Sequence, residues 1–80
     1  MQTLTRNQAI AQCGIDAVNR VDSESPDFSH RELEDIIEFT ASVPCGDDTL
    51  IVYYYQDRRD VDAVESLDEL RWEIAHYAVR

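Results

Sequence analysis

The hydrophobic pattern of the first quarter of the chain predicts a helix that begins after Thr5. Gln8, three residues later, completes a capping-box pattern with Thr5. Gly14 lies beside the apolar stripe, where it either weakens the helix or permits close packing. Apolar residues at helical spacing form this stripe: Ile10, Cys13, Ala17 and Val21.

A second helix is expected from Ser29, with Glu32 as the capping-box partner. Its predicted apolar face consists of Leu33, Ile36, Ile37, Thr40 and Val43. Its opposite face would carry Glu34, Asp35 and Glu38. Residues 44–48 contain Pro, Gly and two Asp and are expected to end the helix in a turn.

Residues 49–55 are rich in β-branched and aromatic side chains and give the clearest strand prediction. Both faces of this strand are apolar, which means that both need some cover. Leu50, Val52 and Tyr54 lie on one face, and Ile51, Tyr53 and Tyr55 on the other. A turn at residues 56–59 would lead to a second, shorter strand over residues 60–64.

Ser66 with Glu69 forms a third capping-box pattern and predicts a last helix. Its core stripe would be Leu67, Leu70, Ile74, Tyr77 and Ala78. The expected fold is therefore a single α+β domain over residues 1–80, in the order α-α-β-β-α. Three helices would pack on a two-stranded antiparallel hairpin, since such a hairpin is marginal alone.

The net charge of the chain is the feature that most restricts which partners it could bind. Seventeen Asp and Glu residues face seven basic residues, all Arg, for a net charge of −10. Phosphates and anionic membranes would be repelled, which argues against direct binding of nucleic acid or of a membrane. A basic partner would be attracted and its association accelerated. The alternative is that the acidity only keeps a small protein soluble.

Two cysteines, Cys13 and Cys45, are too few for a disulfide framework. Reduced thiols in a cytosol are therefore expected. No apolar run is long enough for a membrane span or a signal peptide.

The chain offers no pattern for catalysis, a metal or a cofactor. His30 and His76 do not occur at zinc-ligand spacings with the cysteines. Gly14 and Gly46 are too few for a phosphate-binding loop. The acids fall mainly on predicted solvated faces, whereas acid–base chemistry needs a carboxylate in a pocket. A protein that binds a partner without catalysis is expected.

The acids are expected to form rows. On the predicted last helix Glu65, Glu69 and Glu73 would follow one another at about 6 Å along the axis. On the predicted short strand Asp60 and Asp62 would lie about 6.6–6.8 Å apart. Such spacings approximate successive phosphates of a nucleic-acid strand, although a solvated helix face is the plainer alternative. The candidate partner-binding acids are Glu34, Asp35, Glu38, Asp60, Asp62, Glu65, Asp68, Glu69 and Glu73.

Aromatic residues complete the candidate surface. Trp72 would lie opposite the core stripe of the last helix, among acids, which is typical of an interface anchor. The alternative is that Trp72 packs against the first helix or the hairpin. Tyr53 and Tyr55 would form an exposed aromatic patch if their face of the strand points outward.

The size, acidity, α+β pattern and lack of a catalytic motif together resemble phage-encoded anti-CRISPR proteins, from Met1 to Arg80. The resemblance rests on these features and on no shared motif. Inhibitors of type I surveillance complexes, with type I-C first, are the group it points to. What the resemblance implies is binding to the crRNA-guided Cascade complex and exclusion of target DNA from its positive channel.

Two other binding functions fit the same features. The first is an immunity or antitoxin protein that neutralises a basic nuclease. The second is a phage structural domain that oligomerises through the tyrosine face. The chain itself is expected to be a monomer or a small homo-oligomer.

Overall fold

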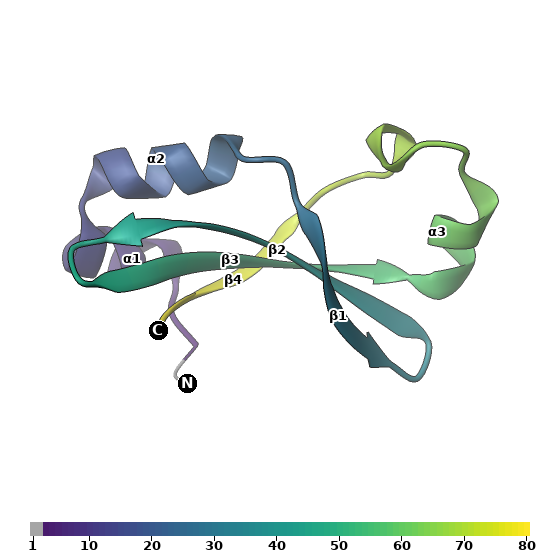
Figure 1. The fold of residues 1–80 in the computed structure, drawn as a ribbon, viewed down its shortest axis with the longest axis horizontal. Helices are drawn as coiled ribbons and strands as arrows, with labels where there is room; N and C mark the ends of the chain where they lie inside the picture. Colours follow the sequence, from purple (N-terminus) through teal and green to yellow (C-terminus); the bar gives the residue numbers. More distant parts are fainter. Residues whose placement is uncertain (1–2) are drawn as a thin grey trace.

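The computed structural model describes residues 3–80, without the side chains of residues 28–30. The elements are α1 (Arg6–Cys13), α2 (Ile15–Ser23), β1 (Asp27–Leu33), β2 (Ile36–Cys45), β3 (Asp48–Asp57), α3 (Arg58–Ala63), a 3₁₀ turn (Leu67–Glu69) and β4 (Ile74–Val79). The strands form one antiparallel sheet in the order β1-β2-β3-β4 (Figure 1). The α+β class is confirmed, but the two-stranded hairpin and the order α-α-β-β-α are wrong.

The predicted second helix is instead the end of β1, the turn after it and most of strand β2. Ile37, Phe39, Ala41 and Val43 alternate with Glu38, Thr40 and Ser42, and this period of two puts all four apolar side chains on one buried face. The ladder with β3 runs without interruption from Ile36↔Asp57 to Cys45↔Asp48. The side chain of Ser29, the predicted cap, lies outside the described residues.

The predicted second strand and last helix are also wrong. Residues 58–63 form the short helix α3, in which the Asp57 side chain caps the backbone N–H of Arg59 at 2.8 Å. Ser66 and Glu69 do form a capping box, but it closes only the 3₁₀ turn. The chain is then extended, and Tyr77, on β4, pairs with Val52, on β3.

The first helix begins after Thr5, and its capping box with Gln8 is confirmed. Gly14 has a φ of +89°, which residues other than glycine rarely adopt. It divides the predicted helix into α1 and α2. The turn brings Cys13 beside the end of β2, with 5.4 Å between the Cα atoms of Cys13 and Cys45. These cysteines form a disulfide, so the expectation of reduced thiols is wrong for this structure.

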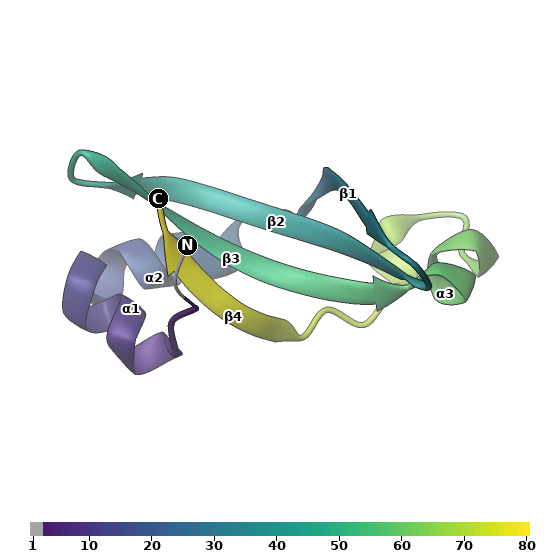
Figure 2. The ribbon, with the colours of Figure 1, turned by 90° about the horizontal axis from the view of Figure 1, so that it is seen from below.

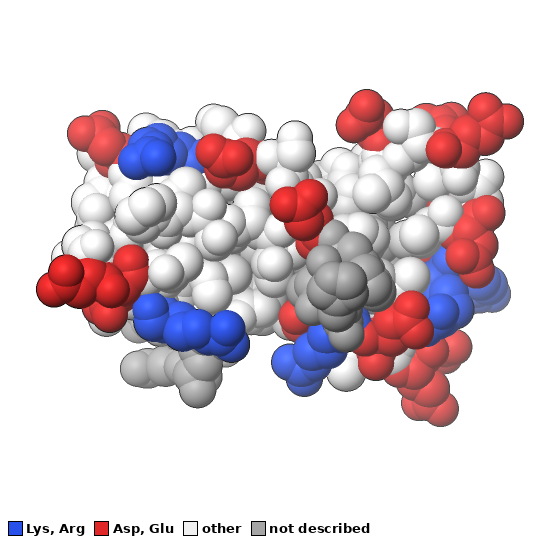
Figure 3. All heavy atoms as spheres, viewed as in Figure 1, with Lys and Arg blue, Asp and Glu red and all other residues white. Residues whose placement is uncertain are grey.

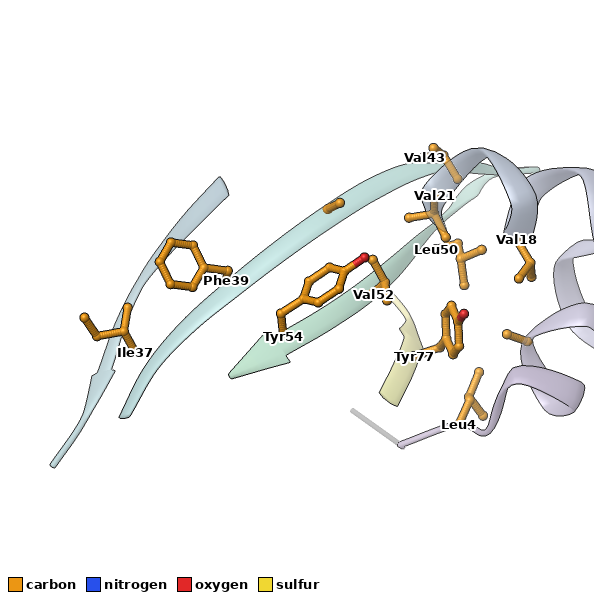
Figure 4. Close-up of a cluster of buried hydrophobic side chains, with 12 residues drawn as sticks. Leu4, Val18, Val21, Ile37, Phe39, Val43, Leu50, Val52, Tyr54 and Tyr77 are labelled. Carbon is orange, nitrogen blue, oxygen red and sulfur yellow. The ribbon is translucent and has the colours of Figure 1, made fainter. Parts of the chain in front are cut away.

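The core lies on one face of the sheet. Helices α1 and α2 cover one end of this face (Figures 1 and 2), and Trp72 packs against the core near the other end. Figure 4 shows Val18 and Val21 of α2 above Leu50, Val52 and Tyr77. The predicted assignment of Leu50, Val52 and Tyr54 to one face of the strand is confirmed by this cluster.

A buried phenol anchors α2 to β4. The hydroxyl of Tyr77 donates a hydrogen bond of 2.7 Å to the Asp22 carboxylate, whose other oxygen accepts one from Arg6 at 2.7 Å. Burial raises the pKa of Tyr77, and the Asp22 hydrogen bond raises it further. The folded state therefore favours the protonated phenol more than the unfolded state does.

Alkaline pH is expected to destabilise the fold through Tyr77. Because the pKa of this group is raised on folding, its contribution is present below the ordinary value of 10.0 and is lost as pH rises above it. The midpoint of urea unfolding should stay level to about pH 10 and then fall. Tyr77→Phe should lower stability by about 1.5 kcal/mol near neutrality and flatten that fall. An equal alkaline slope in both proteins would contradict this role.

Candidate binding surface

One end of the molecule gathers most of the predicted partner-binding acids. The β1–β2 turn, α3 and the segment leading to β4 lie together at the end remote from α1 and α2 (Figures 1 and 2). Acidic side chains crowd this end in Figure 3. We call it the acidic end; its carboxylates are Glu32, Glu34, Asp35, Asp57, Asp60, Asp62, Glu65, Asp68, Glu69 and Glu73.

The arginines of the acidic end are held in ion pairs. Arg58 contacts Glu32 at 3.1 Å, Arg71 contacts Glu73 at 2.8 Å, and Arg59 lies 3.6 Å from its neighbour Asp57. The hydrogen bond to Glu32 raises the pKa of Arg58 first, and the charge of nearby Asp62 and Asp35 adds to this effect. The positive charges of these arginines are therefore already paired with neighbouring carboxylates.

A surplus of negative charge remains. Among the side chains that the structure describes, no cation lies within ion-pair distance of Glu34, Asp35, Asp60, Asp62, Glu65 or Asp68. All six are exposed. Their mutual repulsion would fall if a cationic surface approached, which gives this end a preference for basic partners.

The predicted rows of acids do not exist as rows. Asp60 and Asp62 lie on α3, where each residue is rotated by about 100° from the last, so their side chains diverge. The Glu69 carboxylate accepts hydrogen bonds from the backbone N–H groups of Glu65 and Ser66, each at 3.0 Å. The acids form a cluster at one end of the fold, without the even spacing of a phosphate strand.

Trp72 is half-buried and packs within the chain. Its ring meets Phe39 and Tyr54 edge to face, with centroids 5.0 and 5.5 Å apart. Its Nε1 donates a hydrogen bond of 3.0 Å to the carbonyl of Leu67. The helix face on which the anchor hypothesis was based is absent, and the alternative of packing against the strands is what the structure shows.

Three other residues from the predicted binding surface, Glu38, Tyr53 and Tyr55, meet on the opposite face of the sheet. The pairing of β2 with β3 places Glu38 directly across from Tyr55, and the pairing of β3 with β4 places Tyr53 across from His76. They line a pocket of about 230 Å³, which we call the aromatic pocket. Its lining residues are Thr3, Arg31, Glu38, Tyr53, Tyr55, His76 and Ala78.

The rings of the aromatic pocket lie against one another. Tyr53 and His76 are stacked, with centroids 4.6 Å apart and planes 21° from parallel, and Tyr55 lies 5.8 Å from His76. The expectation that Tyr53 and Tyr55 share a face is confirmed, although Tyr53 is buried and only Tyr55 is exposed.

Glu38 supplies the buried charge of this pocket. Its side chain is 5% exposed, and Arg31 approaches it at 3.7 Å from β1. Burial raises the pKa of Tyr53 and of Tyr55, and the charge of Glu38 adds to both shifts. Tyr55 also shares a hydrogen bond with Glu38. A carboxylate beside an aromatic wall is an environment that favours a cation.

Sequence reasoning missed Arg31 and His76 as parts of a site. The predicted last helix includes His76, and a helix at this position gives no reason to expect a contact between His76 and Tyr53. A strand over residues 74–79 would have placed His76 and Ala78 on one face.

Other kinds of site find no support in the described part of the chain. No group of three His, Cys, Asp or Glu side chains converges there as a metal site would require. Within the same residues, every helix is too short or too polar to cross a membrane.

No protein-family model matches the chain, and no curated protein and no solved structure matches it.

Proposed function

We propose that this protein is an inhibitor that acts by binding and not by catalysis. Its acidic end docks on a basic surface that otherwise holds nucleic acid. The partner that best fits the chain's resemblance to anti-CRISPR proteins is a crRNA-guided type I surveillance complex, with type I-C first, in the host bacterial cytoplasm. The observation that supports this proposal is the cluster of exposed carboxylates that have no cation within ion-pair distance among the described side chains, beside arginines that are already engaged.

Electrostatics explains how such a protein would exclude DNA. A channel that binds a nucleic-acid backbone carries Lys and Arg side chains that attract any dense group of anions. Opposite fields raise the association rate and orient the encounter. Since most of the acids lie at one end of an elongated molecule, 38 Å in its longest extent, the remainder of the fold would obstruct the channel.

Charge reversal in two hairpin turns tests this proposal. Glu34→Arg with Asp35→Arg alters the β1–β2 turn at the acidic end. This double variant should weaken binding to a purified type I-C complex by about a hundredfold, because attraction becomes repulsion. The measurements are affinity and the inhibition of target DNA binding, each at two salt concentrations.

Asp47→Arg with Asp48→Arg is the matched control. It makes the same change of charge at the β2–β3 turn and the first residue of β3, at the opposite end of the molecule (Figure 1). Its affinity should stay within a few-fold of the wild type. Equal losses in both double variants, or none in either, would refute docking through the acidic end. Salt-sensitive binding to a basic nuclease alone would favour the immunity-protein alternative.

A further inference from the structure

We propose that the aromatic pocket is a socket for one arginine side chain of the partner, and that Arg31, which belongs to its lining, pairs with Glu38 until the partner's arginine takes its place. This inference rests on the proposed function for the identity of the partner. It adds a specific contact on the sheet face to the general attraction of the acidic end.

The dimensions of the pocket fit a side-chain group. Pockets for cofactors and drug-sized ligands span about 300–1,000 Å³. The aromatic pocket has about 230 Å³ and opens on the side of the sheet away from α1 and α2. Such a space accommodates a guanidinium and part of its stem.

The lining offers what a guanidinium requires. The stacked rings of Tyr53 and His76 provide aromatic surface in the pocket lining, beside which a planar cation can pack. Glu38 places a carboxylate in the same pocket, and its side chain is 95% enclosed by the protein. Arginine matches both features, whereas the compact ammonium of lysine cannot stack.

Arg31 shows which group Glu38 already pairs with. Its Nη1 lies 3.7 Å from the Oε2 of Glu38, beyond hydrogen-bond distance, and its side chain is 63% exposed. Only the Arg31 end of this ion pair is solvated, so exchanging Arg31 for another guanidinium keeps the buried charge of Glu38 compensated. A partner's arginine could make the closer contact while Arg31 moves into solvent.

Titration with a blocked arginine tests the socket without any partner protein. The probe is N-acetyl-arginine N-methylamide, and its matched control is the neutral citrulline analogue. Ring resonances of His76, Tyr53 and Tyr55 should shift with the arginine probe, while the indole resonance of Trp72 stays in place. Citrulline should give much weaker shifts, because it lacks the positive charge.

Two variants sharpen this result. Arg31→Gln should bind the probe about tenfold more tightly, because the internal competitor is gone. Adding Glu38→Gln to Arg31→Gln should abolish that gain, whereas adding Glu34→Gln should leave it. Equal shifts with citrulline, or no response to Arg31→Gln, would overturn the socket. Neither outcome would affect docking through the acidic end, which the turn variants test separately.

Discussion

Replacing both Cys13 and Cys45 with alanine is expected to lower the free energy of unfolding by about 3–4 kcal/mol. The disulfide joins residues 32 positions apart, so its removal restores the entropy of a long loop to the unfolded chain. A domain of this length has a total stability of about 4–12 kcal/mol. The double variant should therefore remain folded at 25 °C with a smaller free energy of unfolding.

Urea unfolding followed by Trp72 fluorescence measures this effect. Reductant should destabilise the wild type by a similar amount and leave the double variant unchanged. In a bacterial cytosol thiols are kept reduced. The proposed location therefore requires that the reduced protein still folds and binds. Loss of folding in the double variant would contradict that location.

Truncation of Leu50 is expected to have a similar effect. Leu50 is 0% exposed, beneath α2 in the cluster of Figure 4. Leu50→Ala removes buried methyl groups and leaves a cavity, which should lower stability by about 3 kcal/mol. The urea midpoint should fall while the slope of the transition stays the same.

Leu33→Ala is the matched control for Leu50→Ala. It makes the same chemical change on β1, where the side chain of Leu33 is 38% exposed. The loss there should be below about 1 kcal/mol, because little apolar area leaves water on folding. Similar losses at both positions would contradict the assignment of the core to the helix-covered face.

Strand β3 could be predicted because its residues favour a strand by composition and because the strand is also buried in the fold. Residues 49–55 favour a strand by composition, and the alternation of side chains assigned the core face correctly. The start of α1 was predictable for the same reason: the capping box of Thr5 and Gln8 is local.

Strand β2 shows how two patterns can compete in one segment. Leu33, Ile36 and Ile37 have helical spacing, and a capping motif precedes them. The alternation from Ile37 to Val43 equally fits a half-buried strand. The ladder to β3 decides between them, and such pairing of distant residues cannot be read from either pattern alone.

The segment after Ser66 was mispredicted because tertiary contacts outweigh its helical pattern. Trp72 packs on Phe39 and Tyr54, and Tyr77 bonds to Asp22 across 55 positions of the chain. These contacts hold the segment extended against the sheet. A helix there would separate both aromatic residues from their partners.

The candidate site was predictable in its residue types and not in its layout. An excess of acids was evident from composition, but their convergence at one end depends on the contact of α3 with the β1–β2 turn. That contact includes a backbone hydrogen bond of 2.9 Å from Arg58 to Asp35. The aromatic pocket likewise depends on strand register, which brings Glu38, Tyr55 and His76 together.

The structure of this protein bound to a type I-C surveillance complex would test the central claim most directly. Our account predicts that Asp60, Asp62 and the β1–β2 turn lie within ion-pair distance of Arg or Lys side chains of the DNA channel. An interface made chiefly of uncharged contacts, with these carboxylates facing bulk water, would contradict it.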